Sequence, residues 1–208
     1  MGKPGEPTRL LDAIDPPVGV LPRFCRDTQT TIILQDKVFN VSGDSFIVCD
    51  TGGGQILRCA AKGMSLRAKK GVLQLVRVFM RTKLVTLLRK KVVEDPQGNE
   101  LFRIDQKLGI KTKMHTTFKD ASTGKDTTLA LKGDVFRFNA EIMLDNEEGP
   151  VVGTISREYW NDGGWRKNKQ TYYVTVAPGM DLALMIVFCI AFDELKHEQH
   201  GSSGGGGQ

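Results

Sequence analysis

The chain has 208 residues, of which 40% are hydrophobic and 25% are charged, and its net charge is +5. This length limits the protein to one domain with tails, or at most two small domains. The four cysteines form no CxxC pair and no signal peptide precedes them, so we expect a reducing compartment, the cytoplasm, rather than a secreted disulfide scaffold.

The first part of the chain reads as a tail followed by strands. Residues 1–22 contain five prolines and no sustained hydrophobic period, which predicts a disordered Pro-rich tail. Short β-branched and apolar runs then alternate with turns rich in Gly, Pro, Asn and Asp, as in a barrel or a sandwich. The expected strands include residues 30–34, 45–49, 56–60, 91–93, 101–104, 116–119, 127–131, 135–144, 151–159 and 169–176.

Residues 71–90 fit this pattern less well. Polar residues recur at helical spacing from Lys70 through Arg77 to Arg81, which favours an amphipathic helix. The β-branched content of residues 73–78 favours a strand equally. Both alternatives remain open from the sequence.

An uncharged apolar run from Leu182 to Phe192 lies near the C-terminus. As a helix, these residues would span roughly 16 Å, about half of a bilayer core of roughly 30 Å, so we expect no transmembrane span. The run is apolar on every side, and such a helix has to be surrounded by other parts of the fold. Asp181 is placed to begin this helix, and residues 197–208 are expected to form a flexible Gly/Ser tail.

Positive charge is concentrated in one part of the chain. Residues 51–93 contain eleven basic residues and no acidic residue, so the remainder is net acidic. Such asymmetry indicates either solvated strand faces or a surface attracted to phosphate groups. The candidates for contact with an anionic ligand are Lys62, Arg67, Lys69, Lys70, Arg77, Arg81, Lys83, Arg89, Lys90 and Lys91.

No pattern for catalysis stands out. Residues 52–54 are three glycines, but the Walker and Rossmann patterns are absent, so a hairpin turn is the better interpretation. His197 and His200 lie in a polar segment without the further ligands that a metal site needs, and His115 has no nucleophile that we can place beside it. We therefore expect no enzyme, no catalytic residue, no cofactor and no metal site.

Three stretches carry a resemblance to a known family. The most specific is the strand, Pro178, Asp181, the apolar helix and the closing Asp193-Glu194. Residues 62–67 and 95–102 look like hairpins of the same family. Over residues 23–196 the chain resembles the LURP-one-related family, which has a Tubby C-terminal-like fold shared in outline with phospholipid scramblases.

The resemblance implies a mainly-β protein. Its fold would be a closed antiparallel β-barrel of about twelve strands, formed by residues 23–196 around a central hydrophobic C-terminal helix. Residues 71–90 depart from the family pattern, and we expect them to form an insertion outside the barrel. The calcium-binding segment and the membrane anchor of scramblases have no clear counterpart here.

These observations favour a non-catalytic module, active as a monomer. It would bind anionic membrane lipid of the phosphoinositide kind, or a protein partner, through a basic surface. A nucleic-acid-binding or transcription-linked protein is one alternative, ranked lower because Phe79 is the only aromatic residue in the basic stretch. Phospholipid scramblase-like activity is another. The expected location is the cytoplasm, with a peripheral membrane or nuclear site as further options.

Overall fold

The structure is a computed structural model that consists mainly of β-strands and one long α-helix. A short 3-10 helix, η1 (Pro22–Phe24), precedes the strands, and one long helix, α1 (Leu182–Ser202), ends the fold. The structure describes residues 9–37, 45–52, 54–60, 64–66, 76–85, 88–95, 97–107, 112–134, 139–156 and 171–202. The strands are β1 (Thr30–Lys37), β2 (Ser45–Asp50), β3 (Gln55–Ala60), β4 (Met64–Leu66), β5 (Val76–Val85), β6 (Leu88–Glu94), β7 (Glu100–Lys107), β8 (Thr112–Lys119), β9 (Asp126–Asp134), β10 (Asn139–Leu144), β11 (Val151–Ser156) and β12 (Thr171–Val176).

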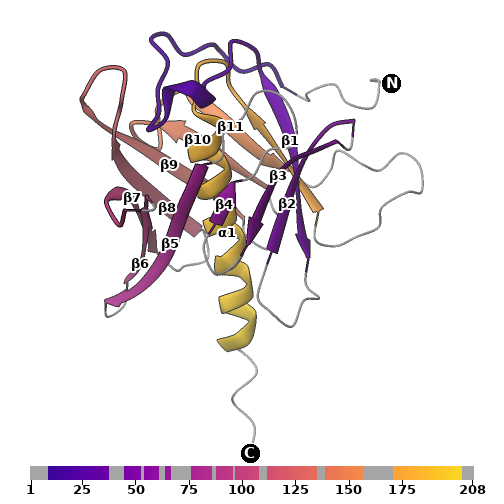
Figure 1. Ribbon diagram of the computed structural model, residues 1–208, viewed down its shortest axis with the longest axis vertical. Helices are drawn as coiled ribbons and strands as arrows, with labels where there is room; N and C mark the ends of the chain where they lie inside the picture. Colours follow the sequence, from indigo (N-terminus) through magenta and orange to yellow (C-terminus); the bar gives the residue numbers. More distant parts are fainter. Residues whose placement is uncertain are drawn as a thin grey trace, which may run out of the picture.

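The strands form one antiparallel sheet that curls around α1 (Figure 1). Their order is β3-β2-β1-β12-β11-β10-β9-β8-β7-β6-β5-β4, so nearly every strand pairs with its neighbour in sequence. The pairings of the described residues do not join β3 to β4, the two ends of this order. The mainly-β architecture with a C-terminal helix is thus confirmed, and closure into a barrel stays a prediction.

Helix α1 occupies the inside of the curled sheet, as its apolar sequence requires. Every residue from Leu182 to Asp193 is buried, so no side of this stretch faces water. Gly153 of β11 permits close packing here, because a Cβ atom at this position would lie 2.4 Å from Cε of Met185. The helix continues to Ser202, so the prediction of a flexible tail from residue 197 is wrong for residues 197–202.

Residues 76–85 and 88–90 belong to the sheet. They lie in β5 and β6, which pair from Phe79↔Glu94 to Val85↔Leu88. The helical alternative for residues 76–85 is therefore wrong, and so is their placement outside the sheet. The physical reason is that β-branched residues at positions 76, 78 and 85 suit a pleated surface, and backbone pairing with β6 satisfies the amides.

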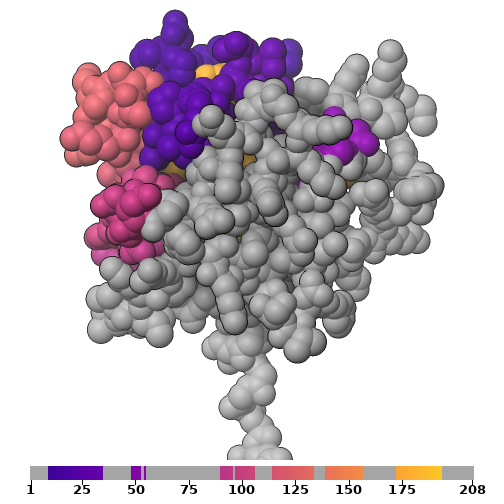
Figure 2. All heavy atoms as spheres, in the orientation of Figure 1, coloured from indigo at the N-terminus to yellow at the C-terminus, as the bar shows by residue number. Residues whose placement is uncertain are grey.

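The N-terminal segment is more ordered than expected. Residues 9–25, here called the strap, cross the end of the sheet where α1 begins, and their Leu11, Val18 and Phe24 belong to the hydrophobic core. Figure 2 shows the strap in indigo at the top, beside the pink β8–β9 hairpin. The predicted disorder is wrong for residues 9–22, because docked backbone amides and buried apolar side chains hold them in place.

Candidate functional site

The predicted basic residues separate into three groups. Lys62, Arg67, Lys69 and Lys70 lie outside the described residues. Three cations lie in β5, namely Arg77, Arg81 and Lys83. Three lie in β6, namely Arg89, Lys90 and Lys91.

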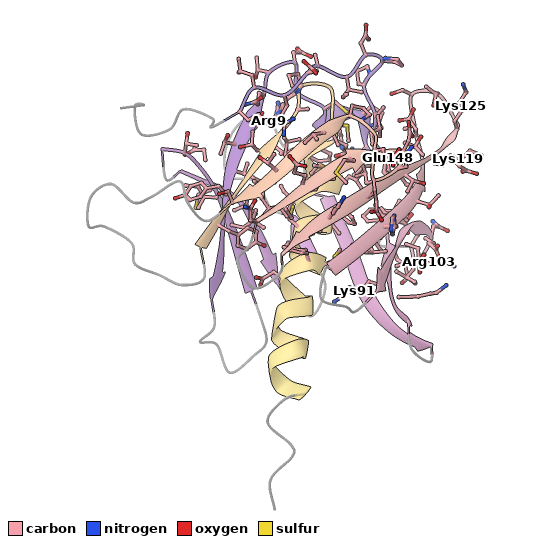
Figure 3. The ribbon with its side chains drawn as sticks, turned by 180° about the vertical axis from the view of Figure 1, so that it is seen from behind. Arg9, Lys91, Arg103, Lys119, Lys125 and Glu148 are labelled. Atoms are coloured by element: carbon pink, nitrogen blue, oxygen red, sulfur yellow. The ribbon has the colours of Figure 1, made fainter. Side chains whose placement is uncertain are left out.

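Lys91 does not belong to an external surface. Its side chain is only 1% exposed, and both Val93, on the same side of β6, and its cross-strand partner Ile104 belong to the core cluster around α1. Successive residues of a strand alternate between the two faces of a sheet, which places Lys91 on the face toward α1; its position is labelled in Figure 3. A buried ammonium cannot contact an outside ligand, so Lys91 is removed from the candidate surface.

Lys90 lies on the outer face, opposite two charged residues. It pairs with Lys83 of β5 and with Asp105 of β7. Its Nζ lies 3.5 Å from Oδ1 of Asp105, and both side chains are partly exposed. The carboxylate of Asp105 offsets the charge of Lys90, and Lys83 adds a further cationic position on β5.

The pairing of β7, β8 and β9 brings together three further lysines that the sequence pattern did not indicate as candidates; they are called the lysine row. Lys107 of β7 lies opposite Lys113 of β8, and Lys113 lies opposite Lys132 of β9. Ile104, Met114 and Leu131 are buried in the core, and the three lysine positions have the opposite parity along their strands; Lys132, whose side chain the structure describes, is exposed. These three lysines are spread over 26 positions of the sequence, so counting charges along a continuous stretch does not reveal that the fold brings them together.

The lysine row carries an electrostatic cost. Residues directly opposite on adjacent antiparallel strands are roughly 5 Å apart, and like charges in such pairs are destabilising. At the end of the row, Glu141 of β10 lies opposite Lys132, but its Oε1 accepts a hydrogen bond of 2.7 Å from Nη1 of Arg9. The row is therefore a basic feature that a bound anion would stabilise.

At the strap end of the sheet, Asp181 joins the strap to the start of α1. Its Oδ1 accepts hydrogen bonds from the amides of Ala183 (2.9 Å) and Leu184 (3.1 Å), which makes it the N-cap of α1 as expected. Its Oδ2 accepts bonds from Val20 (3.1 Å) and Leu21 (2.7 Å) of the strap. Burial raises the pKa of Asp181 to about 6, although the four amide bonds act in the opposite direction.

Asp120, in the turn after β8, also holds the strap. Its Oδ1 accepts a bond of 2.9 Å from the Gly19 amide, and its Oδ2 accepts bonds from the amide and hydroxyl of Thr123. Burial alone would raise the pKa of Asp120, but these bonds outweigh burial and hold the pKa below its usual value. The hydrogen bonds of Asp120 and Asp181 therefore give both carboxylates a structural role in holding the strap.

Beneath the strap lies a small, almost wholly apolar hollow. It has room for roughly one water molecule. The residues lining it are Val20, Leu21, Leu101, Phe102, Asp181, Ala183, Leu184 and Val187. Its only ionisable side chain is Asp181, which already accepts four amide bonds. The hollow therefore presents no free polar group to orient a ligand.

Two of the described thiols, those of Cys25 and Cys189, are poor nucleophiles. Burial and the nearby carboxylates of Asp181 and Asp120 raise the pKa of Cys25 to about 11, and burial raises the pKa of Cys189 further. Within the described ranges, no three His, Cys, Asp or Glu side chains gather as metal ligands. In the same part of the chain, no helix combines the length and the apolar character needed to cross a bilayer.

Comparisons with known proteins identify the family. Searches against curated proteins and against solved structures gave no match. The family described as LURP-one-related matches residues 30–193, from β1 through the buried part of α1. This match covers most of the sequence and includes β5 and β6. The chain therefore belongs to the LURP-one-related family.

Proposed function

We propose that this protein is a non-catalytic module that binds anionic membrane lipid through the outer face of β5–β9. The observation that supports the proposal is the lysine row, in which Lys107, Lys113 and Lys132 occupy paired positions on three adjacent strands. A lysine near an anionic membrane surface contributes about 1 kcal/mol of binding free energy. Lys83 and Lys90 add two cationic positions that pair with each other on the neighbouring strands β5 and β6.

Lipid headgroups suit this arrangement for a geometric reason. Adjacent strands are about 4.8 Å apart, so three paired lysines extend over roughly 10 Å across a broad outer face. A sheet of this kind can approach a planar array of phosphates, and attraction is distributed over several weak contacts. We place the binding at the cytoplasmic face of a membrane, where anionic lipids accumulate.

The proposal also includes the closed form of the fold. β3 and β4 already lie close together, and backbone pairing between them would complete a barrel around α1, as in the Tubby C-terminal-like fold that the family resemblance implies. A closed sheet would leave no free edge and would make the outer face a rigid platform. Cross-linking of introduced cysteines in β3 and β4 would test this closure.

Vesicle flotation tests the lipid proposal. Vesicles of neutral phosphatidylcholine, with and without phosphatidylserine or a phosphoinositide, would be compared at low and high salt, and a DNA duplex would be tested separately. Binding to the anionic vesicles should be strongest at low salt, because salt screens exposed charges. Failure to float with any anionic vesicle at low salt would refute lipid binding, and preference for DNA would favour the nucleic-acid alternative.

Two double variants locate the surface. Lys113→Ala with Lys132→Ala removes two charges of the row and should weaken vesicle binding roughly 30-fold, or about 2 kcal/mol. Lys119→Ala with Lys125→Ala is the matched control, because both lysines are exposed in the β8–β9 hairpin at its other end (Figure 3). Lys119 lies six residues from Lys113 along β8, roughly 20 Å away. Equal losses in both variants would show that binding depends on net charge and not on the row.

A further inference from the structure

His115 lies on the outer face of β8, beside the lysine row. Its strand neighbours Met114 and Thr116 are buried, whereas the His115 side chain is 36% exposed. Asp105 of β7 and Ala130 of β9 occupy the positions opposite His115. The lysine row occupies the next rung of the same parity, so His115 is the closest outward-facing residue to the row on β8.

A carboxylate from a different part of the chain reaches this imidazole. In the turn between β10 and β11, Oε1 of Glu147 lies 3.8 Å from Nε2 of His115. The amide of Asp145, at the start of this turn, donates a 2.7 Å bond to the carbonyl of Thr128 in β9. Ala130, the residue of β9 opposite His115, is fully buried although it has the outward parity. These contacts place the turn over β9, with Glu147 at the edge of the lysine row.

Other charged groups face His115 from the two neighbouring strands. On β7, the opposite residue Asp105 lies 3.5 Å from Nζ of Lys90, which offsets its charge. The diagonal positions on the row side are Lys107 of β7 and Lys132 of β9, and Lys132 is exposed.

Two more cations lie close to His115 along the strands. Lys113 precedes His115 by two positions on β8. Arg103, at the far diagonal on β7, makes an ion pair of 2.9 Å with Glu100 of its own strand. His115 thus marks the boundary between the carboxylate of Glu147 and a group of lysines.

The charge of this boundary depends on the protonation of His115. Imidazole is the side chain that ordinarily changes its charge between pH 5 and 8. With a neutral His115, the Glu147 carboxylate would repel the phosphates that the lysine row contacts. A protonated His115 offsets that carboxylate, and the face becomes more positive by one unit. The negative potential of an anionic leaflet concentrates protons roughly threefold, so approach to the membrane itself favours protonation.

We propose that His115 is a pH sensor of the lipid-binding face, and that protonation of its imidazole beside Glu147 strengthens binding to anionic lipid. This inference rests on the proposed lipid-binding function and adds its regulation by pH. One additional charge near an anionic surface corresponds to a roughly fivefold lower Kd. Proton binding and lipid binding are reciprocal, so each strengthens the other by the same factor.

Vesicle binding on either side of the imidazole range tests the sensor, at about pH 7.5 and about pH 5.5. Full-length protein would be titrated with vesicles of phosphatidylcholine and phosphatidylglycerol, because the phosphodiester of phosphatidylglycerol keeps its charge over this range. Wild type should bind roughly fivefold more tightly at the lower pH. His115→Gln should give nearly the same Kd at both pH values. His115→Lys, whose charge is fixed, should bind at the higher pH as tightly as wild type does at the lower.

The two other histidines of the chain provide the matched control. His197→Gln with His200→Gln changes the C-terminal part of α1 and should leave the fivefold dependence in place. Burial raises the pKa of Asp181 to about 6, so Asp181 titrates in the same range. Urea unfolding at both pH values would therefore check that wild type and each variant stay folded.

The outcomes separate the sensor from the proposed function. Wild type that binds anionic vesicles equally at both pH values would overturn the inference and leave the proposed function intact. So would a His115→Gln variant that keeps the pH dependence, or loss of the dependence in the His197→Gln/His200→Gln variant. Wild type that binds at neither pH would overturn both.

Discussion

Replacement of Gly19 by alanine would test whether the strap is an integral part of the fold. A Cβ atom at Gly19 would lie 2.1 Å from Cβ of Asp181 and 2.9 Å from its Oδ2. Asp181 is fully buried and held by four amide bonds, so it cannot yield, and the strap has to move away. The φ angle of Gly19 is not positive, which means that alanine suits the backbone itself and that any loss comes from this contact.

The cost follows from the bonds that the movement would break. Amides of Gly19, Val20 and Leu21 donate to the carboxylates of Asp120 and Asp181. A hydrogen bond to a charged group contributes about 1.5–3 kcal/mol, so the loss of two of the three would lower the free energy of unfolding by about 3–6 kcal/mol. This is a large part of the roughly 5–15 kcal/mol typical of a domain.

Urea unfolding at pH 7 and amide hydrogen exchange would measure the effect. Gly98→Ala is the control, because Gly98 has a φ of +87° but no atom within 4 Å of an added Cβ, and only a backbone cost of about 1 kcal/mol is expected. Gly19→Ala should also increase exchange at the amides of Val18, Val20 and Leu21. A loss below 1 kcal/mol with unchanged exchange would refute the reasoning.

Three further predictions concern the interior. Phe188→Asp should prevent folding, since it places an unpaired charge at a fully buried position of α1; a soluble variant with native circular dichroism would contradict the placement of the helix. The pKa of the Asp181 carboxyl is about 6 in the folded protein against the ordinary value of 3.8, so the folded state binds the carboxyl proton more tightly than the unfolded state does. The contribution of Asp181 to the free energy of unfolding is therefore greatest below pH 4 and falls by about 3 kcal/mol as the pH rises to 6. Asp181→Asn should remove this dependence from urea midpoints measured between pH 4 and 7, and an unchanged slope would count against it. Thr116→Val should raise the free energy of unfolding by about 1 kcal/mol, because the buried Thr116 hydroxyl has no hydrogen-bond partner among the residues that the structure describes; Thr117→Val, at an exposed position, should change it little, and a loss at Thr116 would show that its hydroxyl is bonded.

Local patterns predicted much of the fold correctly. The apolar run from residue 182 indicated an enclosed helix, and Asp181 was identified as its first capping residue, because both depend on side chains a few positions apart. Turn residues located hairpins such as those around residues 50–55, 95–99 and 120–125. Residues 76–85 were ambiguous because cations at helical spacing and β-branched residues coexist there, and pairing with β6 decided for a strand.

The candidate site was predicted only in part. The concentration of positive charge along the sequence indicated ten candidate cations, but it could not distinguish Lys90 on the outer face from Lys91 on the inner face. That distinction depends on which side of β6 packs against α1, and it follows from strand alternation once the core is known. The same window missed the lysine row, whose members come from three different strands.

The sequence by itself therefore determined the family, the mainly-β character and the buried C-terminal helix, because hydrophobic pattern and turn chemistry are local properties of the chain. Only the tertiary structure decided that the strap docks on Asp181 and Asp120, that Lys91 is inside, and that Lys107, Lys113 and Lys132 occupy paired positions on adjacent strands. These outcomes depend on cross-strand register and on contacts between residues distant in sequence. A shift of one residue in register would turn every side chain of a strand to the opposite face, so the surface is settled only when the strands pair.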